Sequence, residues 1–229
     1  MSSGGNPGQT EAERAKAAES NSERIVKGED AGSATKGTHE IGSTPKDTPD
    51  IAGESLSKVT KVDYSKGAHF TKDGNRKILK PNIKYVDQFG YTYTTDDKGR
   101  ISSVEGDLDL IPDGAADRRN QNAQRKIVRE SGIRGHDDGG HYIGNQFRGS
   151  GDVDNLFPQH GVTNKSGGDW YKMEMVWKEA LSPPKETVEV SMTPIYDDSK
   201  YPNRPSSVIV EYSIGGRRKV TNKIDNPRP

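Results

Sequence analysis

Two stretches of the chain alternate apolar and polar residues with the period of two that a half-buried β strand requires. The predicted strands, each rich in Tyr, Thr or β-branched residues, are 82–87, 90–95, 101–108, 187–196, 207–214 and 218–224. Gly215-Gly216 suits a tight hairpin turn between the last two. The pattern therefore predicts antiparallel strands on both sides of a central region.

The central region ends in a predicted helix with one apolar face. At about 100° per residue, the apolar positions that share this face are Trp170, Met173, Trp177, Ala180 and Leu181. Asp169 is placed to cap a helix that begins at Trp170. Glu174 lies at the edge of the apolar stripe, so two readings stand. Either the carboxylate is desolvated beside a polar partner, or it forms an ordinary pair with Lys178 one turn on.

The first 60 residues have a different composition from the rest. They contain no Phe, Trp or Tyr, and the first aromatic residue is Tyr64. Such a segment cannot bury enough apolar surface to offset its ordering entropy. We expect residues 1–60 to be a disordered or partly helical linker and residues 61–229 to be the folded domain, with its core at 137–181.

The overall composition excludes several classes of site. The chain has no cysteine, which excludes disulfides, thiolate zinc sites and cysteine nucleophiles. Its 34 basic and 34 acidic residues cancel, so any nucleic-acid site must be a local patch. No apolar run reaches the length of a membrane span, and the N-terminus lacks the pattern of a signal peptide.

One local patch is strongly basic. Residues 115–130 predict one or two short helices, and basic residues continue beyond them. The six basic positions, opposed only by Glu130, are Arg118, Arg119, Arg125, Lys126, Arg129 and Arg134. This pattern fits either a solvated helix face or a surface that contacts phosphates.

Residues 137–181 carry the candidate chemistry. His141 follows a pair of glycines, which we expect to let the backbone bend and come close to a ligand, and it precedes a predicted strand start at Tyr142. Its ordinary pKa of about 6.5 suits a general base at neutral pH. Asn155 and Asn164 are placed in loops. An asparagine there is usually part of a turn, but its side-chain oxygen is also a neutral ligand for Mg²⁺.

Three motifs in this order resemble those of the DNA/RNA non-specific endonucleases of the ββα-metal (His-Me finger) class. They are Asp138-Gly139-Gly140-His141, then Asn155-Leu-Phe-Pro-Gln, then Asn164 followed by Trp170-Tyr-Lys-Met-Glu174. The resemblance covers about 91–214 and is strongest to the C-terminal nucleases of bacterial polymorphic toxins. It implies an α+β fold, with a ββα-metal core flanked by antiparallel strands.

The resemblance also implies roles for single residues. His141 would activate water, Asn164 would bind Mg²⁺ or another divalent cation such as Mn²⁺, and Glu174 would orient a metal-bound water. Asp138 and Asn155 would hold the loops or the ligand waters. Glycine stands where the family has an arginine before the histidine. We therefore expect the phosphate-binding arginine elsewhere, the candidates being Arg148, Arg134, Arg118 and Arg119.

Biologically, the resemblance implies a secreted antibacterial toxin that cleaves DNA, and RNA as a further substrate, in the cytoplasm of a target cell. A cognate immunity protein would protect the producing cell. Three alternatives remain open from the sequence. His136 could be the base, His136 and His141 could hold a zinc ion of a hydrolase, or the region could bind nucleic acid without cleaving it.

Overall fold

The computed structural model describes residues 59–74, 76–112, 115, 117 and 119–229. The linker expected over residues 1–60 lies outside this part of the chain, except for its last two residues. The described residues form one compact unit with mixed α and β structure. The α+β fold class expected from the sequence is confirmed.

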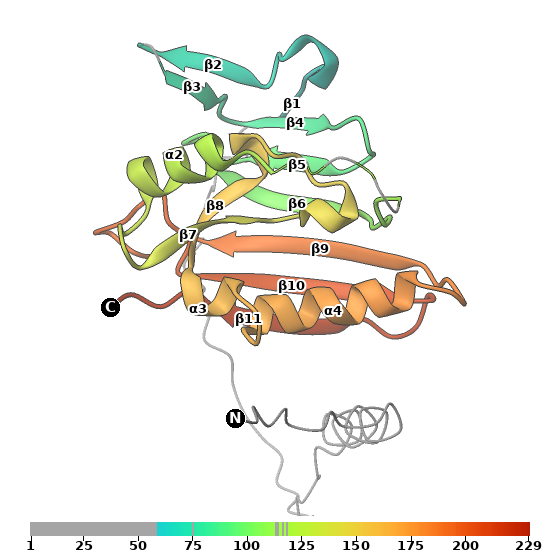
Figure 1. The fold of residues 1–229 in the computed structure, drawn as a ribbon. Coiled ribbons are helices and arrows are strands. Elements are labelled where there is room, and N and C mark those ends of the chain that lie inside the picture. Colours follow the sequence, from blue (N-terminus) through green and yellow to red (C-terminus); the bar gives the residue numbers. More distant parts are fainter. Residues whose placement is uncertain (1–58, 75, 113–114, 116, 118) are drawn as a thin grey trace, which may run out of the picture. The chain divides into compact units, whose positions relative to one another are not determined.

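A seven-stranded sheet forms the base of the domain (Figure 1). Its strands, in spatial order, are β1 (Thr60–Lys61), β4 (Ile83–Val86), β5 (Thr92–Thr95), β6 (Ile101–Asp107), β9 (Val188–Ile195), β10 (Ser207–Ile214) and β11 (Val220–Asp225). All neighbours are antiparallel except β1 and β4. The two groups of strands predicted from the sequence are therefore joined, through β6 and β9, into a single sheet.

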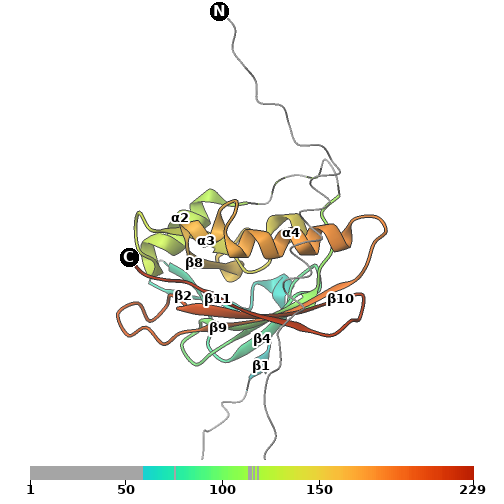
Figure 2. The same cartoon turned by 90° about the horizontal axis from the view of Figure 1, so that it is seen from below.

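The remaining elements lie on one face of this sheet, as the two perpendicular ribbon views show for the helices (Figures 1 and 2). They are helices α2 (Gln121–Ser131), α3 (Gly161–Asn164) and α4 (Asp169–Leu181), and the antiparallel strands β7 (Asp137–His141) and β8 (Leu156–His160). A second hairpin, β2 (Phe70–Asp73) with β3 (Arg76–Leu79), stands beside β4. Three short 3₁₀ turns complete the domain: Tyr64–Lys66, Asn145–Phe147 and Val153–Asn155.

The core lies between the sheet and the layer of α4, β7 and β8. Alternate residues of β9 are buried while the intervening ones face outward, which is the pattern of a sheet with one covered face. Trp170, Met173, Trp177 and Leu181 bring the apolar stripe of α4 into this core, as predicted. Ala180 is only partly buried.

One local prediction about α4 was wrong. Asp169 is the first helical residue rather than the cap, and Gly168 occupies the cap position without a side-chain hydrogen bond. The backbone can turn tightly here only because residue 168 is a glycine. A Cβ atom at this position would collide with the carbonyl oxygens of Val162 and Thr163. Asp169 still lies in the first turn, where a negative charge interacts favourably with the helix dipole.

No helix within the described ranges is both long enough and apolar enough to cross a membrane.

Candidate active site

Two antiparallel strands followed by a helix form the framework of the site. In β7 and β8, His141 pairs with Leu156 and Asp138 pairs with Gln159. The chain then passes through α3 into α4. This is the strand–strand–helix order that the motifs imply, and it places the last residue of β7 beside α4.

The glycines before His141 act differently from the prediction. Gly139 and Gly140 are strand residues rather than a flexible bend, and His141 ends this strand rather than preceding one. A Cβ atom at Gly139 would lie 2.6 Å from the Cα atom of Gln124, and one at Gly140 would collide with the side chain of Gln159. Gly139 therefore allows helix α2 to pack directly on β7, and Gly140 leaves room for the side chain of Gln159 in β8.

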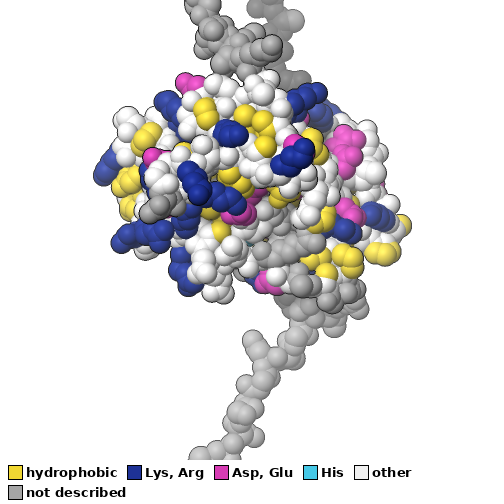
Figure 3. Space-filling view, turned by 90° about the horizontal axis from the view of Figure 1, so that it is seen from above, with side chains coloured by type: hydrophobic (Ala, Val, Ile, Leu, Met, Phe, Trp, Pro, Cys, Tyr) yellow, Lys and Arg dark blue, Asp and Glu magenta, His cyan; other side chains and the backbone are white. Residues whose placement is uncertain are grey.

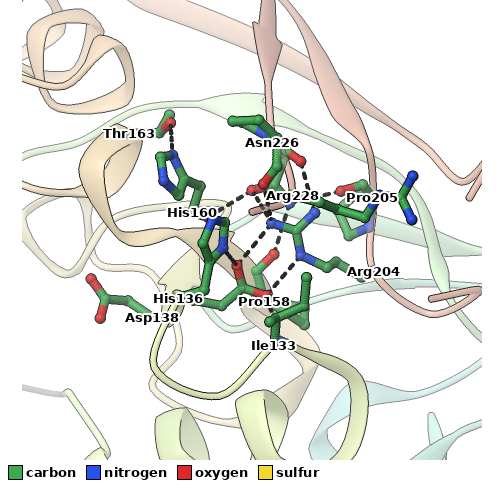
Figure 4. A network of polar contacts seen from close by, with 12 residues as sticks. Ile133, His136, Asp138, Pro158, His160, Thr163, Arg204, Pro205, Asn226 and Arg228 are labelled. Carbon is green, nitrogen blue, oxygen red and sulfur yellow. Dashed lines mark hydrogen bonds and ion pairs between the residues drawn. The ribbon is translucent and has the colours of Figure 1, made fainter. Parts of the chain in front are cut away.

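A buried ion pair fixes the other end of β7 (Figure 4). The guanidinium group of Arg204 donates two hydrogen bonds to Asp137, at 2.7 and 2.8 Å, and both side chains are almost fully buried. Arg204 also donates to the carbonyl oxygens of Asn226 and Pro227. This network ties β7 to the C-terminal segment. The pKa of Asp137 is lowered, since hydrogen bonds to Arg204, Ile133 and His136 outweigh the effect of burial.

A polar pocket of about 390 Å³ opens where β7, α2 and α4 meet. The residues that line it are Arg119, Gln124, His141, Gly144, Asn145, Gln146, Asn164, Trp170 and Glu174. Four of the residues singled out from the sequence are thus gathered in one place: His141, Asn164, Glu174 and Arg119.

The imidazole of His141 is half-buried, and its Nε2 atom is buried without a hydrogen-bond partner in the described part of the chain. The pKa of His141 is lowered to about 4, mainly by burial and also by the charge of Arg119, while Asp117 acts in the opposite sense. The ring is therefore neutral at pH 7, with a nitrogen lone pair available to accept a proton.

The carboxyl group of Glu174 faces the same pocket rather than pairing with Lys178. Burial raises the pKa of Glu174 to about 7, although Trp170 and Gln146 donate hydrogen bonds that partly offset it. Gly144 leaves room for this group, because a Cβ atom there would collide with Oε1 of Glu174. Among the described residues, Glu174 forms no ion pair, and Arg119 in the same pocket is paired with Asp117.

This donor set fits a divalent cation with oxygen ligands. Asn164, which ends the helical turn α3 rather than lying in a loop, contributes a side-chain amide to the pocket, and Glu174 lies in the same pocket. Mg²⁺ prefers few protein oxygen ligands and keeps several of its waters. A cation here would also favour the ionised form of Glu174, which burial alone disfavours.

Asn155 is fully buried and lies outside the pocket, in a 3₁₀ turn rather than the expected loop. Its side-chain oxygen accepts from the backbone N–H of Ile143 and from the hydroxyl of Tyr93. Its amide nitrogen donates to the carbonyl oxygens of Ile143 and Ser150. Asn155 therefore holds the loop that follows His141. Asp138 also lies outside the pocket, where its carboxylate is 3.4 Å from the Nζ atom of Lys165.

The candidate phosphate-binding arginines are distributed over several places. Arg119 lines the pocket, and Asp117 holds its guanidinium group at 2.6 Å. Arg134 lines a neighbouring groove along α2, which also contains Arg125 and Arg129 and shares Gln124 and Asn164 with the pocket. Arg148 pairs with Asp109 at 2.9 Å, away from the pocket. Arg118 lies outside the described residues.

His136 and His141, the two histidines of the alternative hypotheses, lie in different places. His136 is not part of the pocket; its Nδ1 atom lies 3.0 Å from Asp137, and its ring stacks on that of His160 (Figure 4). Within the described ranges, no three His, Cys, Asp or Glu side chains are arranged to hold a metal ion. A zinc site built on His136 and His141 therefore has no geometric support there.

Three polar residues that line the pocket were not predicted from the sequence: Gln124, Asn145 and Gln146. Gln124 lies on α2 and donates to the carbonyl oxygen of Gly139, at 3.1 Å. Gln146 donates to Glu174, at 3.4 Å. Neither glutamine belongs to one of the three motifs, and only the folded positions of α2 and of the turn 145–147 bring them to His141.

A family profile and several curated proteins match the sequence of this chain. A sequence profile of the family described as DNA/RNA non-specific endonuclease matches residues 81–216. The type VII secretion system protein EssD of Staphylococcus aureus (strain USA300) is 39% identical over 164 residues, which are 70% of this chain and 25% of EssD. The chain thus spans about a quarter of the length of the curated relatives it matches.

Two solved structures are similar at low sequence identity. NucA from Streptococcus agalactiae aligns with a TM-score of 0.41 and 19% identity, over 69% of this chain and 83% of NucA. EndoG, from its complex with EndoGI, aligns with a TM-score of 0.43 and 16% identity, over 60% of this chain and 71% of EndoG.

Proposed function

This chain belongs to the DNA/RNA non-specific endonuclease family, and from that premise we propose that His141, Asn164 and Glu174 form the centre at which it hydrolyses phosphodiester bonds. One observation carries the proposal. A neutral histidine with an unpartnered, buried Nε2 atom shares a single pocket with an amide and a carboxyl group suited to a hydrated cation.

His141 is the general base. Its Nε2 atom takes a proton from a water molecule, and the resulting hydroxide attacks the phosphorus while the bond to the 3′ oxygen breaks. The lowered pKa keeps His141 unprotonated at neutral pH, so the base is ready before substrate binds. The product strand then begins with a 5′-phosphate.

Asn164 would be the direct protein ligand of the metal, Mg²⁺ or Mn²⁺. When bound, the cation would supply positive charge that stabilises the phosphate and the departing oxygen. Glu174 would orient a water of the hydrated cation, and Gln146 and Trp170 hold its carboxylate in place. Asn155 and Asp138 act at a distance, by fixing the loop after His141 and the edge of β7.

Arg119 is the residue nearest to the site that can bind the scissile phosphate, and it replaces the arginine missing from the motif. Arg125, Arg129 and Arg134 extend the positive surface along α2, so the next phosphates of the strand lie in that groove. These contacts reach only the backbone of a nucleic acid. Sequence-nonspecific cleavage of DNA follows, with RNA as a second substrate.

The likeness to EssD supports a biological setting. We propose that the chain is the nuclease part of a secreted toxin that acts in the cytoplasm of a target cell, and that an immunity protein protects the producer. Because the face around α2 is basic, the inhibitor is acidic where it binds, and its association weakens as salt is raised. Stable expression of the active chain without a partner and without a growth defect would count against this setting.

Digestion of plasmid DNA and of RNA with and without EDTA tests the proposed function. We expect plasmid to be nicked and degraded with Mg²⁺ or Mn²⁺ and to stay intact with EDTA, while binding to DNA persists in EDTA. Binding to DNA without any metal-dependent cleavage would instead identify a module that binds nucleic acid but does not cleave it.

A further inference from the structure

A second pocket, of about 280 Å³, lies on the other side of the β7–β8 hairpin from the active site. Tyr142 lines it, whereas the preceding residue, His141, lines the active site. Helix α2 borders both pockets: Gln124 lines the active site, and Lys126 and Ile127 line the second pocket. The two pockets are therefore separated by little more than one hairpin and one helix.

The second pocket has an apolar floor and a basic rim. Apolar side chains of the floor are Leu79, Ile101, Ile127, Leu156, Phe157 and Pro158. The rim carries five basic residues, Arg76, Lys77, Lys98, Arg100 and Lys126, against the two acidic residues Asp73 and Glu130. Figure 3 looks onto the end of the molecule that carries β2 and β3, where Lys and Arg side chains are more prominent than Asp and Glu. The pocket thus favours a ligand that is both anionic and partly apolar.

Two of the rim cations are free to bind an anion. Arg76 pairs with Asp73, Lys77 with Asp152 and Arg100 with Asp96. By contrast, neither Lys98 nor Lys126 forms an ion pair with a carboxylate in the part of the chain that the structure describes. Lys126 acts on a carboxylate only at longer range, where its charge helps to lower the pKa of Asp152.

The side chain of Lys126 is held by a hydrogen bond, whereas at Lys98 a hydrogen bond holds the backbone of the turn. The N–H of Lys98 donates to Oδ1 of Asp96 at 2.9 Å, in a turn that ends at Gly99 with a φ of 74°. The Nζ atom of Lys126 donates to the carbonyl oxygen of Lys77 at 3.2 Å, which keeps it at the mouth of the pocket. A site arranged before the ligand arrives loses less entropy on binding.

We propose that this pocket binds the 5′-phosphate end of a nucleotide, with the terminal phosphate between Lys98 and Lys126 and the base against the apolar floor. The proposal rests on the proposed function, because hydrolysis there releases strands that begin with a 5′-phosphate. A terminal phosphomonoester carries a charge of about −1.5 to −2 at pH 7. Two lysines balance this charge better than they would balance the smaller charge of a single internal diester. The cavity is close to the lower limit of small-molecule pockets, about 300 Å³, so it admits one nucleotide and not a duplex.

Calorimetric titration of the intact chain in EDTA tests this site. The probes are thymidine 5′-monophosphate, thymidine and inorganic phosphate. We expect the monophosphate to bind more tightly than either of the other two. The double variant Lys98→Ala/Lys126→Ala should weaken its binding at least tenfold. The double variant Lys219→Ala/Lys223→Ala, which removes the same charge from the distant β11 region, should bind like the wild type.

Three results would overturn the proposal. The first is no binding, or equal binding by the wild type and the Lys98/Lys126 variant. The second is loss of binding in His141→Ala, which would place the nucleotide in the active site. The third is inorganic phosphate binding as tightly as the monophosphate, which would indicate an anion site without a place for the base. Plasmid cleavage by the wild type, measured separately, shows whether the proposed nuclease activity itself has failed.

Discussion

At the scale of single residues, Glu174 is a side chain whose burial disfavours its charged form. Burial raises its pKa from 4.5 to about 7, so the folded protein binds the proton more tightly than the unfolded chain does. The resulting stabilisation is fully present below pH 4.5, decreases as pH rises through about 7 and is absent above it. At pH 8 the ionised carboxylate is therefore a source of instability that a bound cation relieves.

Replacing Glu174 by Gln should raise stability while removing activity. In EDTA at pH 8, we expect Glu174→Gln to increase the free energy of unfolding by about 1–3 kcal/mol, the order implied by a shift of this size. At pH 5 the gain should be much smaller, since the wild-type group is then protonated. Thermal unfolding at both pH values, with and without Mg²⁺, measures this. A lower melting temperature of the variant at pH 8 would contradict our account of the pocket.

Residue identities also show what the sequence could predict about the site. The motifs selected His141, Asn164 and Glu174, and the fold brings these three residues into one pocket. Residue type alone could not separate Asn155 from Asn164, because both roles use the same amide group. The order of the motifs gave Asn155 a role in holding a loop, and its buried hydrogen bonds to Ile143 agree with that role. The motifs could not choose among the arginines, since a phosphate contact depends on where α2 lies and not on a spacing along the chain.

At the scale of elements, the close packing of α2 on β7 determines where Gln124 lies relative to His141. The strand can approach the helix only because residue 139 has no side chain. From the sequence, we expected the glycine pair to let the backbone bend and approach a ligand, since glycine permits both bends and close approaches. Only the neighbouring helix distinguishes the two, and its position is a tertiary property.

Gly139→Ala should therefore destabilise the domain and reduce cleavage. The added methyl group would lie 2.6 Å from the Cα of Gln124, so α2 must move away from β7, at a cost of about 1–3 kcal/mol. Asp138→Ala, in the same strand but partly exposed, is the matched control and should cost less. Chemical denaturation of both variants measures the difference. Equal stability of Gly139→Ala and wild type would show that α2 does not pack as described.

At the scale of the whole molecule, the sequence predicted the strands well but not how they join. Periodicity identified β4, β5, β6, β9, β10 and β11 within one or two residues. It carried no information that β6 pairs with β9, since these strands are about 80 residues apart and the motifs lie between them. The sheet is continuous across the inserted β7–β8–α4 unit, and the helices lie on one face of the sheet.

Removal of residues 1–58 should leave this domain nearly unchanged. The segment contains no aromatic residue and few large apolar ones, so it has little to add to a core. We expect the melting temperature to stay within about 2 °C and the cleavage rate within twofold, by the same argument. Calorimetry and plasmid digestion on the shortened chain measure both. A large drop in melting temperature would show that the segment packs against the domain.

The most direct test of the central claim is the initial rate of plasmid cleavage as a function of Mg²⁺ for His141→Ala, Asn164→Ala and His136→Ala, with DNA affinity measured in EDTA. We predict that His141→Ala lowers turnover by about 10²–10⁴ while DNA affinity changes by only a few-fold. Asn164→Ala should lose a comparable factor and recover partly at high Mg²⁺, and His136→Ala should change little. Loss of cleavage in His136→Ala with a near wild-type rate in His141→Ala would show that the base is His136 and not His141. Wild-type rates in all three variants would contradict the proposed site itself.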